Sequence, residues 1–290
     1  MLSGNVARLN ARTTPKEPDL PNALKKTIYT LRVNDYAPEI CSLTMPLMQA
    51  YADKIGADLV VLTERKRPDW PITIEKFQVA EQAKLRGDDW SIFIDADTLI
   101  NPEFFDPTEL MKKDTVAHNG KDMNLVRWKP DNYFRRDGRW WGSCTWLVIA
   151  SDWTVEDLWQ FPTESPEKTF DQISITVEEH NSGQCHREHL IDDYTLSRNI
   201  ARYGLKATTV LELLGQQGWK TPEGRNFNPY LWHIYTRTWE EKLKRMITVL
   251  STPNQAIIPH PGNPQMAMDV GWGLMDPAQA NQLREKWNLR

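Results

Sequence analysis

Trp90-Ser91-Ile92-Phe93-Ile94-Asp95-Ala96-Asp97 is an apolar stretch that ends in two carboxylates one residue apart. Its β-branched and aromatic residues are typical of a buried strand. Side chains at positions i and i+2 point the same way in extended structure, so a turn beginning here aims both carboxylates at one cation. Ligands collect at the carboxyl ends of strands in α/β sheets. Asp95 and Asp97 are therefore the first candidate binding residues.

Two strand and helix units precede this stretch and favour a ligand site over a plain turn before Asn101-Pro102. Runs of β-branched and aromatic residues predict the strands, and apolar residues three and four apart predict the helices. Pro46 should kink the first helix or mark its true start. Such alternation is typical of an α/β fold with a doubly wound sheet. In chain order we expect a strand at 26–33, a helix at 40–55, a strand at 57–62 and a helix at 76–85.

The chain after Asp97 is expected to complete this domain. The segment 127–141 is rich in Arg, Lys, Trp and Tyr, and we interpret it as a functional loop, either a lid or an acceptor-binding surface. The other expected elements are a helix at 109–113, strands at 115–118 and 145–150, a helix starting after Ser151 or Asp152, a helix at 191–203, and a terminal helix at 277–287 capped by Asp276.

The composition is that of a globular protein, with 40% hydrophobic and 26% charged residues among 290. A net charge of -4 argues against a protein that holds nucleic acid mainly through phosphate contacts. The thirteen Trp favour a carbohydrate or nucleoside ligand, because aromatic faces stack on sugar rings and bases. Three Cys describe no disulfide framework, and the start of the chain lacks a signal-peptide pattern. No apolar run approaches the roughly 20 residues of a membrane span. We therefore expect a cytoplasmic protein without a membrane span.

One competing interpretation of the acidic pair is an aspartyl nucleophile, as in haloacid-dehalogenase-like phosphatases. Those proteins also place an Asp-x-Asp after a strand. Their pattern has Thr or Val two residues past the second Asp and usually follows the first strand of the domain. Here that position is Leu99, and the pair follows the third expected strand. Both differences disfavour phosphoryl transfer.

The order and spacing of these segments resemble those of GT-A-fold glycosyltransferases over residues 26–245. Asp95-Ala96-Asp97 matches the Asp-x-Asp motif of that fold. The resemblance implies a Rossmann-type mixed sheet flanked by helices, in a single domain with a C-terminal extension. Residues 26–118 would form the nucleotide-binding and donor-binding half, and 119–245 the acceptor and catalytic half. Residues 1–25 would be an irregular leader, and 246–290 a Pro-rich segment followed by the terminal helix.

The resemblance also implies which residues bind the donor. The first expected strand resembles the nucleotide-contacting strand of the fold, and Lys76 resembles a basic residue that some members place near the donor. Arg237, late in the domain, would reach the diphosphate. The implied donor-binding residues are Thr30, Leu31, Arg32, Lys76, Asp95, Ala96, Asp97 and Arg237.

Leu231-Trp232-His233-Ile234-Tyr235 is an apolar, strand-like run with one histidine inside it. That histidine resembles the late His that supplies a third metal ligand in many GT-A enzymes. The implied metal ligands are then Asp95, Asp97 and His233, binding Mn²⁺ or Mg²⁺. A lone histidine in an apolar run fits a satisfied core residue equally well.

The segment 191–198 resembles the Glu-Asp-x-x-Leu-x-x-Arg pattern of inverting members, with Asp192 in place of Glu. By position, Asp193 would be the general base that deprotonates an acceptor hydroxyl, or Asp192 if the register shifts by one. Capping of a helix by Asp192 is the simpler alternative. Trp141, Gly142 and Ser143 resemble the segment under the transferred sugar, and they fit a glycine turn beside core Trp equally well.

The predicted function is metal-dependent transfer of a hexosyl or pentosyl group from a nucleoside-diphosphate sugar, a UDP-sugar foremost. The acceptor would be a hydroxyl on a glycan, a small molecule or a modified nucleic acid, and the stereochemistry stays open. One alternative is a sugar-1-phosphate nucleotidyltransferase, but those enzymes usually carry a Gly-rich loop after the first strand, and residues 34–38 contain no glycine. A non-enzymatic carbohydrate-binding protein would bind sugar without metal or nucleotide.

Overall fold

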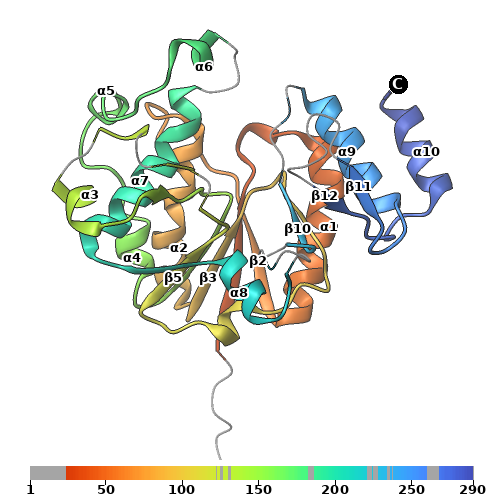
Figure 1. Ribbon diagram of the computed structural model, residues 1–290, viewed down its shortest axis with the longest axis horizontal. Coiled ribbons are helices and arrows are strands. Elements are labelled where there is room, and N and C mark those ends of the chain that lie inside the picture. The colour runs from red at the N-terminus through yellow and green to blue at the C-terminus, as the bar shows by residue number, and fades with distance from the viewer. Residues whose placement is uncertain are drawn as a thin grey trace, which may run out of the picture.

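A six-stranded mixed sheet forms the centre of the computed structural model (Figure 1). The strands lie in the order β2-β1-β3-β8-β5-β9. β8 runs antiparallel to β3 and β5, while the other neighbours are parallel. The expected α/β class, with a mixed sheet flanked by helices, is confirmed. The strands are β1 (Lys26–Leu31), β2 (Ala57–Leu62), β3 (Trp90–Ile94), β5 (Thr115–His118), β8 (Leu147–Ser151) and β9 (Lys206–Thr209).

The structure describes most of the chain from residue 24 onward. The expected leader at 1–25 therefore lies outside the described residues except for its last two positions. Arg237 also lies outside them. The described residues are 24–121, 123–124, 127–129, 132–181, 186–220, 224, 228–233, 236, 238–259 and 268–289.

Side chains that alternate along the strands build two apolar clusters, one on each face of the sheet. Tyr29 and Phe93 belong to the cluster covered by α2, α4 and α7. Ile28 and Ile92 belong to the cluster covered by α1 and α8. Because both faces are covered, β3 and β8 are buried at every residue. These helices are α1 (Pro38–Ile55), α2 (Gln78–Arg86), α4 (Val155–Leu158), α7 (Arg187–Tyr203) and α8 (Val210–Gln216).

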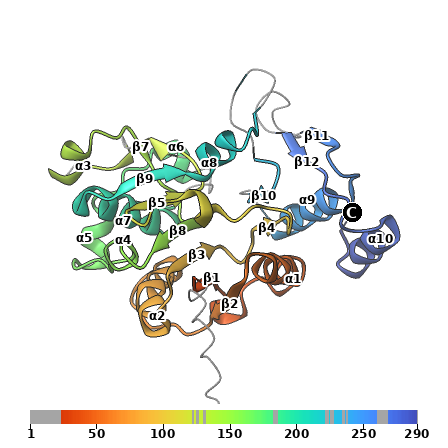
Figure 2. The same cartoon turned by 90° about the horizontal axis from the view of Figure 1, so that it is seen from below.

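The C-terminal part of the chain packs beside α1 (Figures 1 and 2). It lies on the side of the molecule away from β9 (Figure 2). α9 (Trp239–Ser251) and α10 (Pro277–Lys286) form a third apolar cluster with the start of α1, and β11 (Ile257–Pro259) pairs with β12 (Met268–Val270). The expected boundary after residue 245 falls inside α9. Among the described residues, no helix is both long enough and apolar enough to cross a membrane.

Some element boundaries differ from those expected. α1 begins at Pro38, so Pro46 lies inside the helix and does not mark its start. In place of the helix expected at 109–113 there is a short 3-10 turn at Pro107–Leu110, and the side chain of Asp106 caps its start. The helix after β8 has Thr154 at its N-cap position, in place of Ser151 or Asp152. The terminal helix begins at Pro277 with Asp276 as its cap, as expected.

The segment 127–141 is not one irregular loop. It contains α3 (Asn132–Asp137) and β7 (Trp141–Gly142), which pairs with β6 (Met123–Asn124). Trp128 is only 2% exposed and packs edge-on against Tyr194 of α7. Burying so large an aromatic surface stabilises the core, and this draws the start of the segment inward.

His118 ends β5 and is buried against the ring of Trp141. Burial, helped by the nearby charge of Arg139, lowers the pKa of His118 to about 3. The unfolded chain therefore binds more protons than the folded chain between about pH 3 and pH 6.5. The stability contributed by neutral His118 is complete above about pH 6.5 and is lost as the pH falls through this window.

We expect His118→Phe, which keeps an aromatic ring and cannot titrate, to flatten the pH dependence of the unfolding free energy in that window. The slope should decrease by up to about 1.4 kcal/mol per pH unit. Urea unfolding of both proteins at several pH values between about 4 and 6.5 measures the two slopes. Equal slopes would show that His118 is not a buried neutral group.

Candidate metal centre

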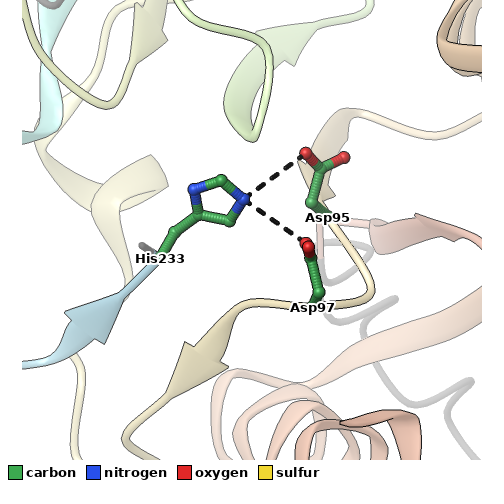
Figure 3. Close-up of side chains that lie close together, drawn as sticks. All are labelled: Asp95, Asp97 and His233. Carbon is green, nitrogen blue, oxygen red and sulfur yellow. Dashed lines mark ion pairs between the residues drawn. The ribbon is translucent and has the colours of Figure 1, made fainter. Parts of the chain in front are cut away.

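Asp95, Asp97 and His233 come together at the carboxyl end of β3 (Figure 3). Their ligand atoms all lie within 4.8 Å of one another. Nε2 of His233 lies 3.4 Å from Oδ1 of Asp97 and 4.0 Å from Oδ2 of Asp95. Two carboxylates and one imidazole are a donor set that fits a divalent cation. The structure thus brings together the three residues that the sequence singled out as metal ligands.

Backbone hydrogen bonds fix the acidic turn. The N–H of Asp95 donates to the carbonyl of Trp146 at 2.8 Å, which continues the pairing of β3 with β8. The N–H of Thr98 donates to the carbonyl of Asp95 at 3.0 Å and closes the turn. The hydroxyl of Thr44, on α1, donates to the carbonyl of Ala96 at 2.5 Å. Sheet and helix together therefore hold both carboxylates in place.

A second, small sheet positions His233 beside the acidic turn. β10 (Leu231–Trp232) pairs antiparallel with β4 (Leu99–Ile100), and Trp232 lies opposite Leu99. The residue after Trp232 consequently lies beside the turn that carries Asp97. The imidazole stacks on Trp146, with ring centroids 5.0 Å apart and 12° between the planes. Its side chain is 20% exposed and faces the acids, so His233 is not a buried core residue.

Lys242 of α9 and Tyr36 complete the surroundings of Asp97. Nζ of Lys242 lies 2.5 Å from Oδ2 of Asp97, and the hydroxyl of Tyr36 donates to the same oxygen at 3.1 Å. Burial would raise the pKa of Asp97, but His233 and Lys242 outweigh it and hold that pKa well below its ordinary value. Asp97 is therefore ionised near neutral pH.

Lys76 joins the metal-ligand candidates to α7. Its Nζ lies 2.9 Å from Oδ1 of Asp95 and 2.9 Å from Oδ2 of Asp192, and it donates to the hydroxyl oxygen of Thr145 at 3.0 Å. Burial would lower the pKa of this lysine, but Asp192 and Asp95 outweigh it and raise that pKa. A charged, buried ammonium thus links two acidic groups. A contact between Lys76 and a donor stays a prediction.

Asp193 lies next to this link on α7. It is 9% exposed, and its Oδ1 accepts the backbone N–H of Thr145 at 2.7 Å. Burial first, and the charge of Asp192 second, raise the pKa of Asp193 well above its ordinary value. α7 begins at Arg187, several residues before either acid, so Asp192 does not cap this helix. The capping interpretation is therefore wrong.

The end of β1 lies beside the end of β3, because the strands pair in parallel with Tyr29 opposite Phe93. The expected donor-binding residues Thr30, Leu31 and Arg32 consequently lie at the same edge of the sheet as the acidic pair. Thr30 is buried, while the other two are partly exposed. Their contact with a donor stays a prediction.

The expected sugar-pocket segment is also placed against α7. The N–H of Ser143 donates to the hydroxyl oxygen of Ser197 at 2.9 Å, one helical turn beyond Asp193. Trp141 is only 9% exposed, whereas the neighbouring Trp140 is 67% exposed. A contact of Trp141, Gly142 and Ser143 with sugar stays a prediction.

Lys242 and Tyr36 are the site residues that the sequence interpretation missed. Thr238 and Glu241 form a Ser/Thr-x-x-Glu pattern that announces the start of α9, and the hydroxyl of Thr238 accepts the N–H of Glu241. That pattern predicts a helix and says nothing about a partner for Lys242. Tyr36 lies in a loop where Asn34, Asp35 and Ala37 have φ of 58°, 50° and 42°. Held together by its tertiary contacts, this unusual backbone directs Tyr36 at the acidic turn.

Neither protein-family models nor curated protein sequences give a match to this chain. Among solved structures, the chain is similar to a glycosyltransferase involved in the glycosylation of the major capsid of PBCV-1. That likeness has 12% sequence identity and a TM-score of 0.46, and it covers 77% of this chain and 98% of the other. The function proposed for this chain therefore rests on the residues of its site.

Lys76→Met removes the buried ammonium and keeps much of the side-chain volume. Asp95 and Asp192 would then remain buried without their shared counter-charge. Because breaking one partner of a buried ion pair costs about 3–5 kcal/mol, we expect the unfolding free energy at neutral pH to fall by about that amount. Urea denaturation measures the loss.

Two further variants test the cause. Adding Asp192→Asn to Lys76→Met should restore part of the stability, because a neutral amide needs no counter-charge. Lys84→Met breaks the exposed pair with Glu156 and should change stability by less than about 1 kcal/mol. Equal losses from Lys76→Met and Lys84→Met would contradict a buried bridging role.

Proposed function

We propose that this protein is a metal-dependent glycosyltransferase that moves a sugar from a nucleoside-diphosphate sugar to a hydroxyl acceptor. One observation carries the proposal: Asp95, Asp97 and His233 converge at the carboxyl end of β3, and Lys76 links them to the acids of α7. The same edge of an α/β sheet is where ligands bind. A metal-ligand set and a candidate base thus border one region.

Asp95, Asp97 and His233 would hold the cation, Mn²⁺ or Mg²⁺. A bound cation of this kind offsets the negative charge that develops on a leaving diphosphate. The chain's own residues keep the ligand atoms in position beforehand: hydrogen bonds fix the acidic turn, and Trp146 supports the imidazole. Such preorganisation supports binding without a large rearrangement of the site.

Asp193 is the proposed general base. It would accept the proton of the acceptor hydroxyl as that oxygen attacks the anomeric carbon and the diphosphate leaves. A raised pKa makes the ionised carboxylate a stronger base. Thr145 fixes the orientation of Asp193 through its backbone N–H and accepts a hydrogen bond from Lys76.

The donor proposed first is a UDP-sugar, and its nucleoside would lie along the end of β1 near residues 30–32. A sugar-1-phosphate nucleotidyltransferase is the second candidate. The observed loop after β1 disfavours it, since this loop carries Tyr36 toward Asp97 and contains no glycine-rich phosphate cradle. A carbohydrate-binding protein without catalysis is the third candidate. Sugar binding alone does not require the buried acids and lysines at this edge, so they disfavour it.

Asp97→Asn keeps the shape of the side chain and removes its charge. We expect Mn²⁺-dependent release of nucleotide from a cleaved UDP-sugar to fall on the order of 100-fold or more, because the cation loses a charged ligand. A panel of nucleotide sugars assayed with and without Mn²⁺ measures this and identifies the donor. Asp53→Asn, on the exposed face of α1, is the control. Equal activity of Asp97→Asn and wild type would exclude the metal role.

The variant Asp193→Asn tests whether Asp193 acts as a general base or as a residue that binds metal or nucleotide. We expect the transfer rate to fall by about 10²–10⁴-fold, while binding of Mn²⁺ and of UDP stays at the wild-type level, because a general base acts on the acceptor proton alone. Single-turnover transfer to the acceptor and calorimetric binding provide the two readouts. The exposed Asp157→Asn is the matched control. An unchanged transfer rate would rule out Asp193 as the base.

A further inference from the structure

Lys242 is a buried cation that has no role in the reaction proposed above. Its Nζ lies 2.5 Å from Oδ2 of Asp97, whereas Nε2 of His233 faces Oδ1 of the same carboxylate. Its side chain is 9% exposed, so α9 holds the ammonium inside the acidic site and not at the surface. Asp97 thus has one oxygen toward the metal-ligand set and the other on a lysine.

Lys242 differs from Lys76 in how many partners hold it. Lys76 contacts Asp95, Asp192 and Thr145. Within the described part of the chain, the ammonium of Lys242 has Asp97 as its acceptor. An ammonium carries three N–H donors, so two of those on Lys242 have no acceptor among the described residues. The contact with Asp97 is therefore the more easily exchanged of the two.

The charges at this site set up a competition. Asp97 is only 14% exposed, and a buried carboxylate needs a positive partner. Lys242 provides that charge from the side opposite His233. A divalent cation on Asp95, Asp97 and His233 would add two positive charges close to the ammonium, and like charges at such separations repel. Lysine and cation therefore compete for the charge of Asp97.

We propose that Lys242 is an exchangeable counter-ion that occupies Asp97 until a divalent cation binds and then donates its hydrogen bonds to the phosphates of the nucleotide. The inference rests on the proposed function, because a nucleoside diphosphate supplies the new acceptor. Two consequences follow from this exchange. Lys242 weakens cation binding when no nucleotide is present, and it strengthens the mutual coupling between cation and nucleotide, which is reciprocal by thermodynamic necessity.

The first test measures Mn²⁺ binding by calorimetry without nucleotide. Lys242→Met should bind Mn²⁺ on the order of tenfold more tightly than wild type, because the competing charge is gone. Lys242→Arg keeps the charge and should stay near the wild-type affinity. Lys244→Met removes a charge from the same helix away from Asp97, and it should change nothing. Lys242→Gln provides the same comparison if the methionine variant does not fold.

The second test repeats the titrations at saturating UDP. In wild type, UDP should strengthen Mn²⁺ binding by a larger factor than in Lys242→Met, with the two factors differing on the order of tenfold. Equal or weaker Mn²⁺ binding by both neutral variants without nucleotide would overturn the exchange and leave the proposed metal site standing. Wild-type protein that binds no Mn²⁺, with or without UDP, would overturn the metal site itself, and the exchange with it.

Discussion

The buried ammonium of Lys76 is the contact on which the site depends. Asp95 and Asp192 come from different parts of the chain. Their negative charges would repel each other in this buried place, where little water screens them. A lysine 2.9 Å from each makes their approach favourable. Through Thr145 the same ammonium also reaches the strand that neighbours β3. One ammonium therefore joins the acidic turn to Asp192 of α7 and, through Thr145, to the neighbouring Asp193.

The C-terminal part of the chain supports the other side of the site. Trp232, Leu99 and residues of α9 share the third apolar cluster, so packing there determines where His233 and Lys242 lie. The indole N–H of Trp272 donates to the carbonyl of Pro229 at 2.9 Å and ties the terminal segment to the approach of β10. The extension expected at 246–290 thus begins inside α9, the helix that carries Lys242, and packs with it beside the candidate metal centre.

The two lysines of the site balance different negative charges. Lys76 has several internal partners and acts as a fixed counter-ion, as expected of a group that must keep acids in register. Lys242 has a single acidic partner among the described residues and lies at the ligand that a cation would claim. In the proposed glycosyl transfer, one lysine would hold the site together while the other responds to what binds.

The sequence by itself determined the α/β class and the strand that carries Asp95 and Asp97, because strand patterns and turn residues are local signals. Its resemblance to GT-A enzymes singled out His233 and Asp193 as candidates. Only the tertiary structure decided which way these side chains face. The pairing of β4 with β10 brings His233 to the acids, and helix packing brings Lys242 to Asp97. A lysine in an amphipathic helix looks the same in sequence whether it meets water or a buried carboxylate. Its partner depends on contacts between residues far apart in the chain, which no local pattern encodes.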